Sequence, residues 1–409
     1  MNVRNMNDKI QKRIAALTIV ILFSILWFAC NQTAQIPTDS NSTTNKSFIS
    51  PGTKAKMDAQ LKDWKTKIPE IFAKVKTQSK ESPQEREALV TAEVSSRAEE
   101  FKTQFQSRMQ NSSKRQPDQI TSGNQIYVPD DYSTIQEAVD AAAPGDEIIV
   151  RDGDYYEDVS VVTDSLTIKS ENGFGSVFLY GAIEFEGVTG GKADGLVSIG
   201  DGGYSFIGGI FVVGCSDVAV KNSAVGYGLG IIIYISSNCN AKDNIAGYNL
   251  PLDPTYFFGG ITVAGSSGNL VSGNYAFANG FSGIGLIESY GNNVKNNICD
   301  DNGGYPDGSF LELYNGILDI SFGTGGNNHY MNNEASGNLF CGMLLAYSDN
   351  NKIGPTNTFN ENDILGLYLF ESDYNVVQKN TAHDNGEVDM VDEGVGNQFI
   401  NNDFGTTYP

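Results

Sequence analysis

Two adjacent aspartates, Asp300 and Asp301 in the string CDDNGG, have the residue type and spacing for chemistry on a sugar. Hydrolysis of a glycosidic bond needs two carboxyl groups around one sugar, one as acid and one as nucleophile or base. Carboxylates are also ligands that Ca²⁺ prefers. Aspartates on a turn can equally cap the turn or be solvated. The pair is a candidate catalytic or calcium site, with a structural role as the alternative.

Two further acidic residues, Glu288 and Asp319, are low-ranked catalytic candidates. Asp319 interrupts the apolar strand GILDIS, and a local bulge that turns it to solvent is the plainer interpretation. If the protein is an enzyme, these carboxylates should converge on one sugar and at least one should have a raised pKa. His329 and His383 are expected at the surface of turns, and no Cys/His cluster has the spacing of a zinc site.

An internal repeat must position these residues. Short strings such as DVAVKN, NLVSGN and NVVQKN place a polar residue four or five positions before an asparagine, and their starts recur mostly every 22 to 24 residues. A period of this length marks a solenoid, in which each coil buries its apolar face only against its neighbours. The aligned starts are Asp217, Cys239, Asn269, Asn292, Asn328, Asn351, Asn375 and Asn397.

A second strand follows a glycine in each coil, as in GIIIYIS (230–236) and GLYLFES (366–372). Short strands separated by Asn and Gly turns, without a helix inside the period, argue against leucine-rich and helical repeats. Asparagines in register can form hydrogen-bond ladders along the stack. The sequence therefore predicts an all-β, right-handed parallel β-helix over 126–409.

The first coil is preceded by an amphipathic stretch at Thr134–Ala142, which is expected to cap the open end of the stack. The string STIQEAVDAAAPGDEIIVRDGDYYEDVSVVTDSLTIKSENG closely resembles the pectate-lyase-like superfamily. This resemblance implies the β-helix fold and a polysaccharide ligand, because the superfamily includes lyases, hydrolases and epimerases besides noncatalytic relatives. It does not fix a reaction.

The motifs of catalysis that the resemblance implies are incomplete. Lyases of this fold use Lys or Arg as base, yet no arginine follows Arg151 and the lysines are spread along the repeat. The His-Gly and Arg-x-Lys pairs of polygalacturonases and the Asp-Pro-His-Asp string of alginate epimerases are missing. Bound Ca²⁺ can still supply positive charge.

Two coils are longer than the others, and their insertions, 249–260 and 303–316, fall at matching positions. They are expected on one side of the solenoid as the walls of a groove. Aromatic residues there can stack on sugars and acidic ones can bind hydroxyl groups or Ca²⁺, although packing of the loops is the equal alternative. The candidate residues are Asp253, Tyr256, Phe257, Phe258, Tyr305, Asp307, Phe310, Glu312 and Tyr314.

The outer face of the second strand in each coil is also apolar, as Ile232, Leu344 and Tyr368 illustrate. Such a face should be covered. Residues 54–112 carry apolar residues three or four apart, typical of amphipathic helices. The helical pair within this segment is the preferred cover, and a partner subunit is the alternative.

The start of the chain reads as an export signal. Residues 1–30 combine basic residues, an apolar stretch and Cys30, as in bacterial lipoproteins whose cysteine is lipidated; an ordinary signal or an uncleaved anchor is the alternative. Residues 31–53 have the composition of a flexible tether, and 113–125 form a linker. A membrane partner through a lipid anchor and a place in the cell envelope follow.

Composition disfavours nucleic acid as a partner. From Ile126 onward the chain has 37 acidic and 8 basic residues, whereas phosphate contacts need a basic surface. The four cysteines in this region, Cys215, Cys239, Cys299 and Cys341, fall at different repeat positions and are expected as buried free thiols. Two functions remain open: a surface lipoprotein that binds polysaccharide, which is slightly favoured, and a carbohydrate-active enzyme, possibly assisted by Ca²⁺.

Overall fold

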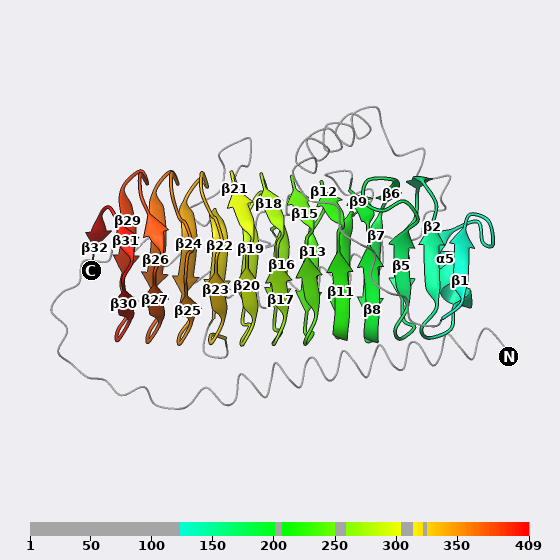
Figure 1. Cartoon of the computed structure of the whole chain (residues 1–409), viewed down its shortest axis with the longest axis horizontal. Coiled ribbons are helices and arrows are strands. Elements are labelled where there is room, and N and C mark those ends of the chain that lie inside the picture. The colour runs from blue at the N-terminus through cyan, green and yellow to red at the C-terminus, as the bar shows by residue number, and fades with distance from the viewer. Residues whose placement is uncertain (1–122, 201–206, 250–258, 304–313, 322–324, 409) are drawn as a thin grey trace. The chain divides into compact units, whose positions relative to one another are not determined.

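The computed structural model describes residues 123–200, 207–249, 259–303, 314–321 and 325–408. Within these ranges the chain winds into successive coils, each of which contributes one strand to each of up to three parallel sheets, here named A, B and C. The strands stack side by side from β1 to β32 (Figure 1). The parallel β-helix predicted from the repeat is confirmed. The predicted export signal, tether, helical segment and linker lie almost entirely outside the described residues.

Sheet A has twelve strands, which pair in parallel in the order in which the following list gives them. They are β1 (Gln125–Val128), β2 (Glu147–Val150), β5 (Thr167–Ser170), β8 (Thr189–Asp194), β11 (Ser216–Lys221), β14 (Asn240–Lys242), β17 (Leu270–Ser272), β20 (Asn293–Lys295), β23 (His329–Met331), β25 (Lys352–Ile353), β27 (Val376–Gln378) and β30 (Gln398–Ile400).

Sheet B has seven strands and continues through single bridges to a final pair. The seven are β3 (Gly153–Tyr155), β6 (Val177–Tyr180), β9 (Leu196–Ile199), β12 (Ala224–Gly226), β15 (Ile245–Gly247), β18 (Tyr275–Phe277) and β21 (Ile298–Asp300), and the pair is β28 (Thr381–Ala382) and β31 (Asp403–Phe404).

Sheet C has eleven strands. They are β4 (Val159–Val161), β7 (Ala182–Glu186), β10 (Gly209–Val213), β13 (Ile231–Tyr234), β16 (Ile261–Ala264), β19 (Ser282–Ile287), β22 (Asn315–Ile320), β24 (Cys341–Ala346), β26 (Leu365–Phe370), β29 (Val388–Asp392) and β32 (Thr407–Tyr408).

The core lies inside the coils, because alternate side chains of every strand point inward. In sheet C the register aligns Ile231, Ile261 and Ile284 with one another, and all three are buried in the main apolar cluster. Met343 and Leu367 continue this row. Burial of each such side chain contributes about 1.5–3 kcal/mol, so stacking of coils supplies the stability that no single coil has.

The helix α5 (Ile135–Ala141) caps the first coil, as predicted. Thr134 is its N-cap, and its hydroxyl oxygen accepts a hydrogen bond from the Glu137 amide. Ile135, Ala138 and Val139 are buried, and the helix contacts β1, β2 and β4.

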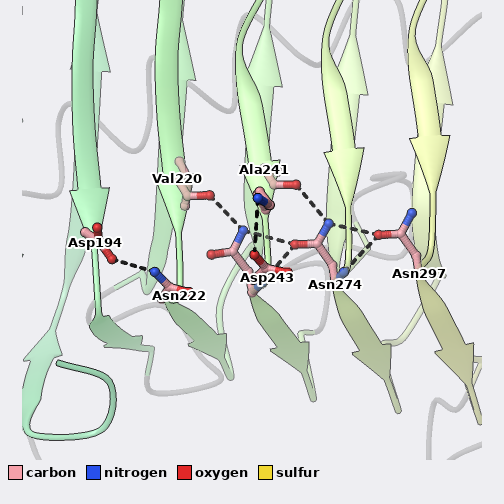
Figure 2. Close-up of polar contacts among 9 residues, drawn as sticks. Asp194, Val220, Asn222, Ala241, Asp243, Asn274 and Asn297 are labelled. Carbon is pink, nitrogen blue, oxygen red and sulfur yellow. Dashed lines mark hydrogen bonds and ion pairs between the residues drawn. The ribbon is translucent and has the colours of Figure 1, made fainter. Parts of the chain in front are cut away.

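The predicted asparagine ladder lies at the turn from sheet A to sheet B (Figure 2). Asn244 Nδ2 donates to Asn274 Oδ1 at 3.0 Å, and Asn274 Nδ2 donates to Asn297 Oδ1 at the same distance. The residue before each ladder position, such as Asp243 or Asn296, has a positive φ that Asp and Asn tolerate. The short repeat strings thus encode both the turn and the ladder.

The four cysteines of the described coils are buried and free, as expected. Among the described residues, no helix is long and apolar enough to cross a membrane.

Candidate functional site

Asp300 and Asp301 lie at the end of sheet B. Asp300 is the last residue of β21, half-buried, in register with Phe277 on the outer side of the sheet. Asp301 is exposed and has a positive φ of 54°, so it forms the turn that follows. The pair therefore projects outside the coil and not into its core.

Asp319 lies on the opposite side of the wall, inside the coil. It stays in register between Leu286 and Leu345 and is fully buried, so a bulge that turns it to solvent is wrong. Desolvation raises its pKa to about 6, although hydrogen bonds from Tyr330 and Asn328 partly oppose this. A polysaccharide outside the coil cannot reach a carboxylate in this position.

Glu288 follows β19 at a turn, where its amide donates to the Ile320 carbonyl at 2.8 Å. Its charge contributes to the raised pKa of Asp319, whereas Asp300 and Asp301 belong to sheet B and its outer turn. The structure does not bring these four carboxylates together around one sugar.

The two long insertions both connect a strand of sheet B to a strand of sheet C. One joins β15 to β16 and the other joins β21 to β22, with the short β18–β19 connection between them. They therefore leave the same edge, as expected from their spacing. Tyr314, at the end of the second, is buried and packs in the apolar cluster outside sheet C. The remaining candidates, Asp253, Tyr256, Phe257, Phe258, Tyr305, Asp307, Phe310 and Glu312, lie outside the described residues, as does Cys30.

Basic residues gather on one sheet. Every lysine and arginine of the described residues lies on a strand of sheet A or directly after one. They are Arg151, Lys169, Lys192, Lys221, Lys242, Lys295, Lys352 and Lys379. We call the outer side of sheet A from β11 to β25 the lysine face, because it carries Lys221, Lys242, Lys295 and Lys352.

The parallel register aligns these lysines. Lys221 pairs with Lys242, Lys242 with Ser272, and Ser272 with Lys295 in adjacent coils. Met331 on β23 continues the row. The strands from β14 to β30 contain no acidic residue. This part of the surface is therefore locally positive on a strongly acidic domain.

Ion pairs neutralise this surface only at its start. Lys169 Nζ lies 2.7 Å from Glu147 Oε1, and Lys192 Nζ lies 3.7 Å from Asp194 Oδ2. Lys242 Nζ lies 3.9 Å from Asp243 Oδ2 with its side chain about half exposed, a contact worth little. The lysine face thus keeps charge that is accessible to an anionic ligand.

The outer side of sheet B differs in charge. Its open part carries Asp300, Glu334 and Asp403, and His383 Nε2 lies 3.3 Å from Asp403 Oδ1. The aromatic rings nearer the start stack on one another: Tyr227 and Tyr248 are nearly parallel with centroids 5.4 Å apart. This arrangement disfavours an acidic ligand on sheet B.

Sequence reasoning listed the lysines but missed that they share a face. A signal was present, because Lys221, Lys242, Lys295 and Lys379 each directly precede the turn that leads to the ladder asparagine. A fixed place in the repeat means a fixed side of the solenoid.

Two family models match adjacent parts of the sequence. Residues 204–317 match the right-handed beta helix region, and residues 312–408 match the periplasmic copper-binding protein NosD. The chain is a right-handed parallel β-helix repeat protein. No curated protein matches the sequence.

Solved structures similar to this β-helix share its fold at low sequence identity. Pectate lyase Pel9A is 16% identical, with a TM-score of 0.45 over 71% of this chain and 79% of its own. A DFA-IIIase from Arthrobacter chlorophenolicus A6, without its lid, is 15% identical, with a TM-score of 0.42 over 68% and 94%. The periplasmic alginate epimerase AlgG is 14% identical, with a TM-score of 0.34 over 70% and 84%.

The copper named for the NosD family does not fit an evident site in this β-helix. The described residues contain no group of three or more His, Cys, Asp or Glu placed to hold a metal. His329 lies on sheet A and His383 follows a strand of sheet B. Burial raises the pKa of the Cys341 thiol, which disfavours the thiolate that binds copper.

Proposed function

We propose that this β-helix binds an acidic polysaccharide along its lysine face. The observation that supports the proposal is the confinement of all described basic residues to sheet A, on a domain with 37 acidic residues. Chance placement on a three-sided solenoid would distribute them over all sides. A local positive row inside an overall negative field selects and orients an anionic polymer.

The spacing of the row suits an extended polymer. Adjacent coils lie about 4.8 Å apart, so lysines in register present positive charge at intervals comparable with the length of one sugar. Lys221 and Lys242 occupy adjacent coils, and Lys295 follows two coils later. Uncharged donors and acceptors, such as Asn293 beside Lys295, can bind hydroxyl groups between the carboxylates.

Binding along a flat strand surface does not require catalysis. A lyase would need a base and a charge-neutralising group at one sugar, and the candidate carboxylates are divided between two sides of the wall. The carbohydrate-active enzyme stays the alternative function, and its products would be detected in the same incubations.

Export of the chain completes the proposal. The apolar stretch before Cys30 and the following polar tether support a lipid-anchored protein of the cell envelope. The description of NosD as periplasmic is in keeping with this location. A tether of this composition would let the β-helix reach polymers at a distance from the membrane.

The test measures binding of the purified full-length chain, in detergent, to polygalacturonate, alginate and neutral dextran at low and high NaCl. Acidic polymers should bind and dextran should not. Replacing Lys221, Lys242 and Lys295 together by Gln should weaken binding about a hundredfold, since each contact contributes about 1 kcal/mol. Parallel incubations with Ca²⁺ or chelator, analysed by mass spectrometry, report any cleavage.

Two controls separate charge from general damage. The triple Lys→Arg variant keeps the charge and should keep the affinity. Glu334→Gln, on the outer side of sheet B, removes a negative charge elsewhere and should not weaken binding. Unchanged affinity of the Lys→Gln triple variant, or equal binding of dextran and polygalacturonate, would contradict the proposal.

A further inference from the structure

Sheet C has apolar side chains on both of its sides. The inner rows form the main core, while a second apolar cluster lies on the outer side. Its members come from many coils in register, so that Leu318 pairs with Leu344 and Leu344 with Tyr368. Phe211, Ile232, Leu318, Leu344, Tyr368 and Phe370 have at most 1% of their surface exposed.

Strand pairing alone does not bury such side chains. The outer side of a sheet stays open to solvent unless another layer packs on it. Among the described residues the helix α5 is the sole helix, and it contacts β1, β2 and β4 at the start of the stack. The layer that covers the outer side from β10 to β29 must therefore come from residues outside the described ranges.

We propose that residues 54–110 of the same chain form this layer as two amphipathic helices packed on the outer side of sheet C. The first apolar stripe contains Met57, Leu61, Trp64 and Ile68, before Pro69 bends or interrupts the helix. The second contains Val90, Val94, Phe101 and Phe105. Ser82, Pro83 and Glu85 provide the N-cap, first-turn proline and capping-box acid of the second helix.

The dimensions of the segment match the surface. Eight strands of sheet C, from β10 to β29, span about 34 Å at the spacing of parallel strands. A helix from Pro83 to Gln110 would be about 42 Å long, so it can cross this whole series of coils. The insertions 250–258 and 304–313 are too short to cover more than the coils from which they arise.

Charge also selects this segment. Residues 54–81 contain eight lysines and four acidic residues. Carboxylates border the outer side of sheet C at Glu186, Glu288, Glu371 and Glu393, at or beside strand ends. A lysine-rich helix packed between these borders places opposite charges close together. A second copy of the β-helix would instead bring two acidic domains together.

Photo-cross-linking tests the contact in the full-length chain. A benzophenone amino acid replaces Phe105, and mass spectrometry of proteolytic fragments identifies what it captures. The proposal expects links within one chain to fragments that contain strands of sheet C. Links between two chains, or links to strands of sheet A or sheet B alone, would overturn it.

Paired variants test the apolar stripe independently. Phe101→Asp with Phe105→Asp should uncover the outer side of sheet C and increase binding of the dye ANS. Ser96→Asp with Thr103→Asp adds the same charge to the opposite side of the helix and should leave ANS binding unchanged. Equal behaviour of the two pairs would show that the stripe does not cover an apolar surface. Neither result depends on polysaccharide binding, so this inference fails or holds separately from the proposed function.

Discussion

The Tyr330 hydroxyl donates a hydrogen bond to Asp319 Oδ2 at 2.5 Å across the core of the β-helix. Tyr330 comes from β23 of sheet A and Asp319 from β22 of sheet C, and both side chains are fully buried. Asn328 Nδ2 donates to the same oxygen at 3.1 Å. The bonds tie two sheets together, yet burial still raises the pKa of Asp319 to about 6. At neutral pH the core thus contains a carboxylate whose ionisation opposes folding.

Replacing Asp319 by Asn should stabilise the protein at neutral pH. The folded pKa of about 6 exceeds the ordinary value of 3.8, so the folded state holds the proton more tightly than the unfolded state. Stability contributed by the protonated acid is full at low pH and is lost as pH rises through 6. The variant should gain about 1–3 kcal/mol at pH 7.5 and little at pH 4. Urea unfolding at both pH values measures this, with exposed Asp403→Asn as control; equal effects at both would contradict it.

Tyr330→Phe should destabilise the protein by about 1–3 kcal/mol at pH 7.5, because the buried carboxylate loses a donor. The cost should be smaller at pH 4, where Asp319 is protonated in the folded state. In the Asp319→Asn background the same substitution should also cost less. A double-mutant cycle from urea unfolding measures the coupling, and a coupling energy near zero would show that the bond does not stabilise the ionised acid.

Asn274→Ala should cost about 3 kcal/mol or more, because it leaves several buried groups without partners. Its side chain accepts from the amide and side chain of Asn244 and donates to the Ala241 carbonyl and to Asn297. Asn293→Ala, an exposed position on β20, serves as the matched control and should cost far less. Thermal unfolding of both variants is the measurement, and similar losses would argue against the ladder as a source of stability.

The fold was predictable because its determinants recur in every coil. The asparagine before the turn, the glycine before the next strand and the inward Ile or Leu row each appear many times, so their period could be read without three-dimensional information. The helix α5 was likewise marked by local signals, including Thr134 as N-cap.

The site was less predictable because it depends on which residues share a side of the solenoid. Asp300 and Asp319 are close in sequence but lie on opposite sides of the wall, and no local pattern distinguishes them. The inward position of Asp319 is tolerated because Tyr330, from another sheet, supplies a donor. The lysine face required the register between coils, even though its residues have a common place in the repeat.

Cys30→Ser should release the chain from membranes if Cys30 carries the lipid. The short apolar stretch before it should otherwise be removed as a signal, and the polar tether offers no hydrophobic anchor. Fractionation of cells that produce each form measures this, and metabolic labelling with a fatty acid serves as the direct readout. A variant that stays in the membrane fraction would favour an uncleaved N-terminal anchor.

Met331→Lys should strengthen the binding of an acidic polysaccharide, because it extends the lysine row by one coil beyond Lys295. Met331 pairs with Lys295 in register, and its side chain is half-buried on the outer side of sheet A. One further contact of about 1 kcal/mol corresponds to roughly fivefold in affinity, and the gain should shrink as NaCl screens the charge. Thr358→Lys adds the same charge to the outer side of sheet B and is the matched control. An equal gain from both variants would mean that net charge, and not the aligned row, governs binding.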